Sequence, residues 1–188
     1  MFFRFWVLAP ARLTEYDTIR YCQYDTVIKN RAGARMPGKA RLGEGCFVKK
    51  DVIVSISGLQ QADEQEPDKV ELVTPGRFYL RDGNYYISYH ESELTGMEGT
   101  RTTVKVGPGR RVSITRTGRN HSQLCFEPGQ RSNALYQTEY GPLNVATITE
   151  RVESCLGSDG GSLEIRYAVE IDNVYAATNH LKIDVRVS

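Results

Sequence analysis

Hydrophobic and polar residues alternate along most of the chain after residue 48, in short runs separated by turn residues. A period of two is typical of strands with one buried face. Glycine, proline, asparagine and aspartate separate the runs, as at Asp82-Gly83, and favour tight turns. The pattern predicts ten strands, over residues 49–58, 70–80, 84–94, 100–106, 111–117, 122–126, 134–140, 143–155, 163–171 and 181–187.

The predicted strands follow one another through short connections, without a convincing helix between them. Sequential strands with short turns pair antiparallel. An open sheet of so many strands would leave long exposed edges, which closure into a barrel removes. We therefore predict an all-β fold for residues 49–188, a closed antiparallel meander of about 8–10 strands in a barrel.

Residues 1–48 show no sustained period, and the glycine-rich basic segment 31–45 is typical of a linker. The first 50 residues hold 10 Lys and Arg against 4 Asp and Glu, although the whole chain carries a net charge of only +1. We predict a basic, poorly structured leader or linker. Met36 leaves an over-extended start open, and the alternative is a genuine basic arm that contacts nucleic acid or an acidic surface.

The cysteines show neither a CxxC motif nor a histidine at zinc-ligand spacing. We therefore expect no metal and no cofactor, and two small buried thiols, Cys125 and Cys155, in a reducing compartment. No apolar run approaches the roughly 18 residues that span a bilayer, and Arg4 interrupts the N-terminal run. These observations favour a cytoplasmic protein without a membrane segment.

Six stretches carry a likeness to a known family: KDVIVSISG, VELVTPGRFY, NYYISYHESELTGMEGTRTTVKV, RSNALYQTEYG, LEIRYAVEID and LKIDVRVS. Residues 49–188 resemble the YwiB-like family, a bacterial family of unknown function with a calycin-like (lipocalin-like) β-barrel. The most specific part is the order Tyr89, Glu91, Gly96, Thr100 and Thr102. The resemblance implies a barrel and a cytoplasmic bacterial protein, and it brings no activity or catalytic residues. The Gly-x-Trp signature of true lipocalins is missing, because the first strand ends in ISG.

Tyrosine, threonine, a carboxylate and an arginine stand at alternate positions of otherwise good strands. Small barrels point alternate residues inward, so these side chains would line the lumen with hydroxyls and one cation. We predict non-catalytic binding of a small amphiphilic or anionic molecule in the barrel by Tyr89, Glu91, Thr100, Thr102, Arg116, Tyr136 and Thr138. The alternative is that they form cross-strand pairs on the surface, because Thr and Tyr are good strand residues.

Two other classes of function remain open. An enzyme would use Glu91 and Glu93 as a carboxylate pair, because the predicted strand places both on one face, with His90 on the other. An interaction module would use the barrel exterior or the basic leader to meet a partner protein or RNA. Basic side chains near two successive turns would then form a rim for an anion or an RNA backbone: Arg116, Arg119, His121 and Arg131.

Overall fold

A computed structural model describes residues 49–62, 66–119, 121–138 and 141–188, with the backbone alone for 135–138, 141 and 142. The described chain is almost entirely strand, and its two 3₁₀ turns, η1 (Glu93–Thr95) and η2 (Pro108–Arg110), lie in connections. The strands are β1 (Lys50–Gln61), β2 (Asp68–Arg81), β3 (Asn84–His90), β4 (Thr100–Val106), β5 (Val112–Gly118), β6 (Ser122–Phe126), β7 (Arg131–Thr138), β8 (Gly141–Gly157), β9 (Gly160–Ile171) and β10 (Val174–Val187).

The ten strands form one antiparallel sheet in the order β6-β5-β4-β3-β2-β1-β10-β9-β8-β7. Every pair of neighbours except β1 and β10 is consecutive in sequence, and the first and last strands pair with each other from Val52↔Val187 to Gln61↔Thr178. The sheet therefore starts and ends at β6 and β7, which are joined by residues 127–130. The predicted all-β meander is confirmed.

Backbone contacts across the β6–β7 connection bring the two ends of the sheet together into a nearly closed barrel. The Gly129 amide donates to the Thr149 carbonyl at 2.8 Å, and the Thr149 amide donates to the Gln130 carbonyl at 3.1 Å. The Thr147 hydroxyl donates to the Cys125 carbonyl at 3.3 Å. The edges of the sheet are thus covered by chain from the same barrel.

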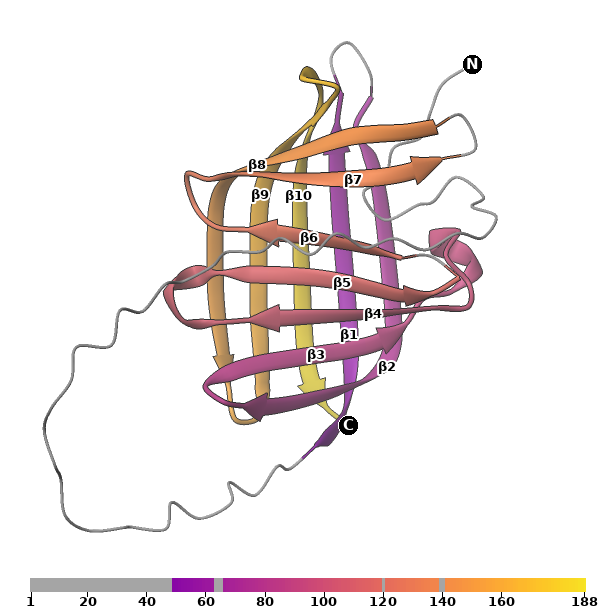
Figure 1. The fold of residues 1–188 in the computed structure, drawn as a ribbon. Helices are drawn as coiled ribbons and strands as arrows, with labels where there is room; N and C mark the ends of the chain where they lie inside the picture. Colours follow the sequence, from indigo (N-terminus) through magenta and orange to yellow (C-terminus); the bar gives the residue numbers. More distant parts are fainter. Residues whose placement is uncertain (1–48, 63–65, 120, 139–140) are drawn as a thin grey trace, which may run out of the picture. The chain divides into compact units, whose positions relative to one another are not determined.

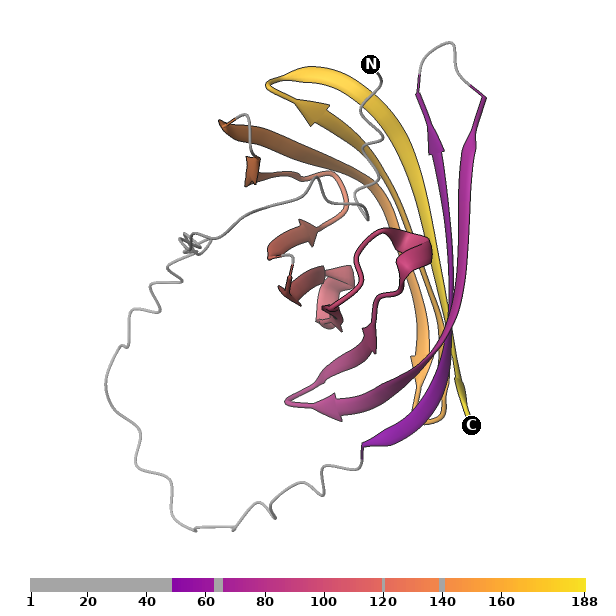
Figure 2. The same cartoon turned by 90° about the vertical axis from the view of Figure 1, so that its right-hand side faces the viewer.

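The barrel has two faces whose strands cross steeply. Strands β3–β6 run roughly horizontally in Figure 1, while β1, β9 and β10 run roughly vertically behind them. Figure 2 shows the two layers from the side. The long strands β2 and β8 take part in both layers, because each pairs with one neighbour at each end. This is the arrangement of orthogonally packed sheets, whose corners are made by strands that bend or carry bulges.

Gly76 lies where β2 turns from one layer to the other. A Cβ atom at this position would lie 2.6 Å from Cγ2 of Val54 and 2.9 Å from the Ser88 carbonyl oxygen. Only glycine fits at this corner without displacing its neighbours. The sequence prediction of a bend at Pro75-Gly76 therefore has a packing explanation.

The core lies between the two layers and consists of the alternate residues that the sequence pattern selects. From β1, the residues Val52, Val54 and Ile56 are buried, and from β9 the same holds for Leu163, Ile165 and Val169. The hairpin turn at Asp82-Gly83 adopts positive φ at both residues (49° and 72°), which fits the tight turn expected there.

Two of the strand boundaries that differ from the prediction, together with one bulge, have consequences for the site. Strand β3 ends at His90 rather than 94, because the chain enters η1, and β10 begins at Val174 rather than 181. A bulge in β8 shifts the register between Thr149 and Arg151. The predicted leader, 1–48, lies outside the described residues, as do Cys22 and Cys46. Within the described part of the chain, no helix is long and apolar enough to cross a membrane.

Candidate functional site

We call the layer that contains strands β3–β6 the front layer. A row of four polar side chains crosses its inner face. Tyr89 of β3 pairs with Thr102 of β4, Thr102 with Arg116 of β5, and Arg116 with Ser122 of β6. Tyr89, Thr102 and Arg116 are buried, and Ser122 is half-buried. The next row along the same strands is apolar and buried: Ile87, Val104, Ile114 and Leu124. The row Tyr89–Thr102–Arg116–Ser122, called the polar row below, therefore lies at one end of a hydrophobic core.

Glu91 extends the polar row just beyond the end of β3. Its amide donates to the Thr100 carbonyl at 2.9 Å, which continues the pairing of β3 with β4 for one more step. Its carboxylate accepts a 2.5 Å hydrogen bond from the Thr102 hydroxyl. Glu91 is 6% exposed and Thr100 is fully buried. A buried carboxylate thus joins the polar row and is held by one of its members.

The Glu91 carboxylate and the Arg116 guanidinium both influence the ionisation of Tyr89. Burial raises the pKa of the Tyr89 phenol well above its ordinary value, and the Glu91 carboxylate raises it further, while Arg116 and the Thr102 hydrogen bond act in the opposite direction. The phenol therefore stays protonated over the physiological pH range and can serve as a hydrogen-bond donor.

Arg116 is the residue of the polar row that the described contacts leave unsatisfied. It is 3% exposed. Its Nη1 donates to the Ser122 hydroxyl at a long 3.4 Å. Among the described residues, its Nε and Nη2 find no hydrogen-bond partner. Because a buried donor without a partner costs about 1–3 kcal/mol, this arrangement requires an explanation.

The connection from β3 to β4 shapes the same end of the barrel. Gly96 and Gly99 take positive φ (69° and 79°), and Met97 between them is 2% exposed. A Cβ atom on Gly118 would lie 2.4 Å from the Gly99 carbonyl oxygen, and Gly118 has φ of 110°. Gly99 and Gly118 thus let the connection pack directly against the end of β5.

A second set of inward polar residues lies on the other layer. Tyr167 of β9 pairs with Asn179 of β10 on one side and with Thr149 of β8 on the other. All three are buried, and the Tyr167 ring packs on Phe126 with centroids 4.8 Å apart. Within the described part of the chain, Thr149 Oγ1 and Asn179 Nδ2 have no hydrogen-bond partner. The sequence prediction missed Asn179, because it began the last strand at residue 181.

The structure places the seven predicted ligand-binding residues as follows. The side chains of Tyr89, Glu91, Thr100, Thr102 and Arg116 are buried. The alternative that they form surface pairs is therefore wrong for these five. Tyr136 and Thr138 belong to β7, but their side chains lie outside the described residues. Ser122 joins the row without having been predicted, because a lone serine in a short strand carries no distinctive pattern.

The predicted carboxylate pair is wrong, because Glu93 lies in η1 and is exposed while Glu91 is buried. The predicted basic rim is wrong as well. Arg116 points inward, whereas Arg131 at the start of β7 is hydrogen-bonded to Glu170 at 2.9 Å. These two arginines therefore do not act at one surface.

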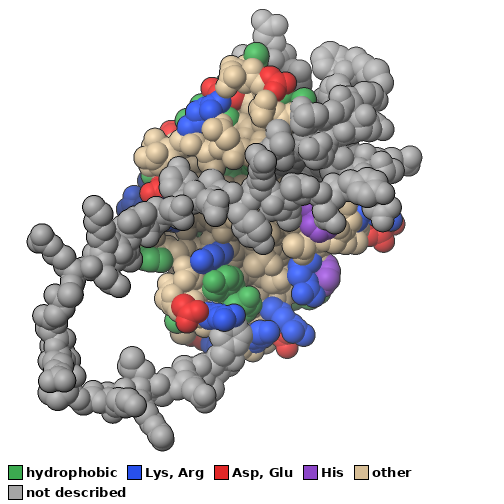
Figure 3. Space-filling view, viewed as in Figure 1, with side chains coloured by type: hydrophobic (Ala, Val, Ile, Leu, Met, Phe, Trp, Pro, Cys, Tyr) green, Lys and Arg blue, Asp and Glu red, His purple; other side chains and the backbone are tan. Residues whose placement is uncertain are grey.

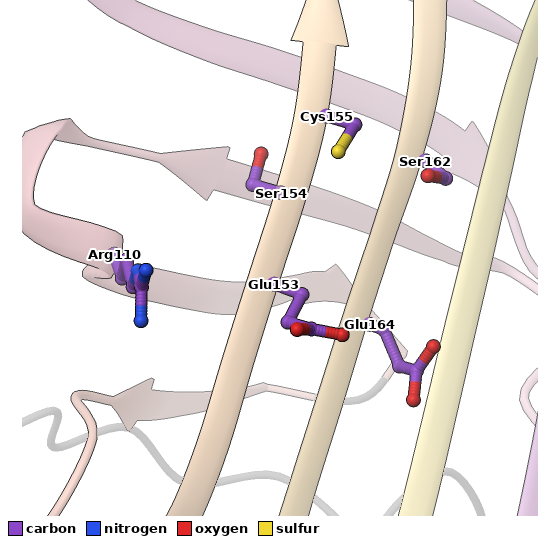
Figure 4. Close-up of a pocket in the computed structure, with 6 residues that line it drawn as sticks. All are labelled: Arg110, Glu153, Ser154, Cys155, Ser162 and Glu164. Carbon is purple, nitrogen blue, oxygen red and sulfur yellow. The ribbon is translucent and has the colours of Figure 1, made fainter.

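Outside the core, a shallow hollow lies beside the ends of β8 and β9 (Figure 4). Its lining residues are Arg110, Glu153, Ser154, Cys155, Ser162 and Glu164. Burial opposes the shift, but contacts with His180 at 2.8 Å and with Arg166 hold the pKa of Glu164 below its ordinary value. The two carboxylates that line the hollow are thus already paired with arginines, Glu153 with Arg151 and Glu164 with Arg166.

The two cysteines of the described residues differ in exposure. Cys125 is half-buried and Cys155 is exposed, so the expectation of two buried thiols is wrong for Cys155, while both are free. Among the described residues, no group of three His, Cys, Asp or Glu side chains is placed to hold a metal ion.

Residues 54–183 match the model of a domain of unknown function, DUF1934, and the match runs from within β1 to within β10. The chain belongs to this family. The DUF1934 match includes every member of the polar row. It shows the predicted YwiB-like membership, and it assigns no activity.

Two comparisons place the chain beside a DUF1934-type barrel from Bacillus subtilis. The chain is similar to the uncharacterized beta-barrel protein YwiB of strain 168, with 28% identity over 109 residues, which are 58% of this chain and 75% of that protein. It also resembles the crystal structure of the YwiB protein from Bacillus subtilis, with a TM-score of 0.62 and 21% identity over 76% of this chain and 95% of that one. The structural likeness supports the barrel fold alone.

Proposed function

We propose that the barrel binds a small anion without catalysing a reaction, and that Arg116 is the anchor of the site. The observation that carries this proposal is the burial of Arg116 with Nε and Nη2 unpaired among the described residues. A family of unknown function and a barrel fold are compatible with such a site, and the contacts of Arg116 supply the chemistry.

The two unpaired nitrogens of Arg116 belong to one edge of the guanidinium. Nε and Nη2 point their N–H groups in parallel, which is the fork that binds both oxygens of a carboxylate or two oxygens of a phosphate. The opposite side is held by Ser122 through Nη1. An oxyanion at this edge would satisfy both donors at once and would be bound by charge-assisted hydrogen bonds.

The neighbours of Arg116 add further polar contacts. The Thr102 hydroxyl and the neutral Tyr89 phenol are both hydrogen-bonded to Glu91, so the Ser122 hydroxyl is the remaining donor of the polar row beside Arg116. Glu91 repels an anion and also places an acceptor near the site, which favours a ligand that carries a hydroxyl or amine beside its acidic group. The apolar row formed by Ile87, Val104 and Ile114 borders the site and favours a small apolar portion.

The proposal is tested by native mass spectrometry of the full chain, purified without denaturation from the cells that naturally produce it. We expect the natural protein to carry a small acidic molecule that is released on denaturation. The variant Arg116→Met removes the fork at similar volume and is expected to be isolated without this molecule. Arg186→Met, exposed near the end of β10, is the matched control and should retain it.

Retention of the same molecule by Arg116→Met would contradict the proposal, because the anchor would then lie elsewhere. Natural protein without any bound molecule, and without a change in unfolding temperature on addition of acetate or inorganic phosphate, would also contradict it.

A further inference from the structure

The outer face of the front layer carries a stack of two tyrosines between two lysines. Tyr79 of β2 pairs with Tyr86 of β3, and their rings stack with centroids 4.9 Å apart and planes 12° from parallel. Lys105 Nζ lies 6.0 Å from the Tyr86 ring centre, and Lys49 Nζ lies 5.7 Å from that of Tyr79. Both rings are half-exposed. This aromatic stack, Tyr79–Tyr86, is therefore presented on the surface and bounded by cations at both ends.

Polar side chains continue the same surface beside the aromatic stack. Arg77, Ser88, Thr103, Thr115 and Gln123 pair in one outward row across β2–β6. The Ser88 and Thr103 hydroxyls are 3.3 Å apart. Rows on one face of a sheet are about 7 Å apart, so this row lies directly beside the rings. Hydroxyls and an amide are thus within reach of any flat group stacked on the tyrosines.

The electrostatics of this face are mainly positive, although Arg77 of β2 lies 4.0 Å from the Asp51 carboxylate of β1. Strands β3–β6 contain no aspartate or glutamate in any of their residues. Arg101 is exposed on β4, with its Nη2 3.3 Å from the exposed His90. Within the described part of the chain, Lys105 forms no ion pair. Figure 3 shows several Lys and Arg side chains around hydrophobic ones in its lower half, where β3 and β4 run in Figure 1, with fewer Asp or Glu side chains at the edge.

The outer face of the other layer differs in its charges. There, Arg151 pairs with Glu153, Arg166 with Glu164 at 3.4 Å, and Lys182 with Asp184 at 3.3 Å. These three cations of β8–β10 are therefore neutralised by carboxylates on the same strands. In the front layer, by contrast, two stacked and half-exposed aromatic rings lie beside Lys105, for which the described residues provide no carboxylate partner.

We infer that the face formed by Tyr79, Tyr86, Lys105, Arg77 and Arg101 binds a single-stranded polynucleotide. Bases stack on exposed aromatic rings, and cations beside the rings bind the phosphates of the backbone. A base that stacks on Tyr86 displaces the Lys105 ammonium from the ring toward the adjacent phosphate. Duplexes fit this face less well, because their bases are already stacked inside the helix. The site is separate from Arg116, which points into the barrel.

Fluorescence anisotropy of the full chain tests this inference, with labelled oligouridine and oligothymidine of about 12 nucleotides, which cover one domain-sized site. A duplex of the same length tests the preference for single strands. Unlabelled polyglutamate, added as a competitor, tests whether any polyanion binds. We expect both single strands to bind at low salt, more tightly than the duplex, and polyglutamate to compete poorly. The tighter of the two single strands then distinguishes RNA from DNA.

Two variants locate the binding. Tyr86→Leu keeps an apolar side chain but removes the ring, and we expect binding about 5- to 100-fold weaker. Lys105→Glu should weaken binding and reduce the slope of log affinity against log salt by about one or more. Lys182→Glu on β10 makes the same change of charge on the other layer and should leave binding unchanged. Thermal unfolding confirms that each variant is folded.

Five results would overturn the inference. Absence of binding to both single strands at low salt is the first. Equal effects of Lys105→Glu and Lys182→Glu would show a general response to net charge, and unchanged binding by both Tyr86→Leu and Lys105→Glu would show that the contact lies outside this face. Equal affinity for the duplex, or full competition by polyglutamate, would show attraction to polyanions without base stacking.

Discussion

Replacing Arg116 with methionine should stabilise the ligand-free protein, although the residue is almost completely buried. Arg116 is 3% exposed, and its only described hydrogen bond, to Ser122, is 3.4 Å long. The two unpaired donors cost about 1–3 kcal/mol each, and methionine fills a similar volume without a polar atom. Losing the attraction to Glu91 offsets part of this gain. We therefore expect the free energy of unfolding to rise by about 1–3 kcal/mol, as for other buried charges replaced by apolar residues.

The full chain is first denatured, separated from small molecules and refolded. Its urea unfolding, monitored by far-ultraviolet circular dichroism, then measures the change in the free energy of unfolding. For a domain of this size, the expected gain corresponds to an increase in melting temperature of about 2–4 °C per kcal/mol. Arg101→Met, exposed on the outer face, should change stability by less than about 0.5 kcal/mol. The double variant Arg116→Met with Glu91→Gln should be at least as stable as the single one, because it removes both buried charges.

Destabilisation by Arg116→Met would refute this reasoning. Breaking a satisfied buried ion pair costs about 3–5 kcal/mol, because the remaining charge is left without a partner. Such a loss would show that Arg116 serves Glu91 and the fold rather than a ligand. The sign of the change therefore separates a structural arginine from a binding one.

Two further predictions concern residues that border the site. Burial raises the pKa of Tyr89 above its ordinary value of 10.0, so the stability it contributes is fully present below about pH 10 and is lost as pH rises further. Tyr89→Phe should make the fall in stability above pH 10 shallower, by up to about 1.4 kcal/mol per pH unit. The control Tyr175→Phe, at a residue that is 44% exposed, should leave the fall unchanged. Equal pH profiles of the two variants would contradict the assignment of the raised pKa to Tyr89. Gly76→Ala should destabilise the barrel by about 1–3 kcal/mol in urea unfolding, because its Cβ would lie 2.6 Å from Val54 Cγ2. Gly157→Ala, whose Cβ would meet nothing within 4 Å, is the matched control, and equal losses for both glycines would show that the corner is not tightly packed.

The alternation of residues was sufficient to predict most of the barrel and part of the polar row. Thr100 and Thr102 share a strand face with Val104 and Val106, so burial of the valines places the threonines inside as well. The same argument places Arg116 beside Ile114 at the inner face of β5. In these strands, local period and tertiary packing agree, and the faces could be assigned without a structure.

The remaining features depend on contacts that the local pattern does not contain. The bulge in β8 exposes Arg151, although the sequence predicts it on the same face as Thr149, which is buried. Glu93 continues the period of β3, but the chain turns into η1 before reaching it. Asn179 is drawn into β10 by its pairing with Tyr167, which no local propensity indicates. Bulges, strand ends and pairing partners therefore set the limits of the prediction.

The most direct test of an anion site at Arg116 is to add back what the natural protein releases. The small-molecule fraction obtained by denaturing the natural protein is mixed with refolded, bare protein and with refolded Arg116→Met, and both are weighed by native mass spectrometry. The bare natural sequence should regain the mass of one acidic molecule, and Arg116→Met should not. Equal uptake by the two proteins, or uptake by neither, would contradict the assignment of Arg116 as the anchor.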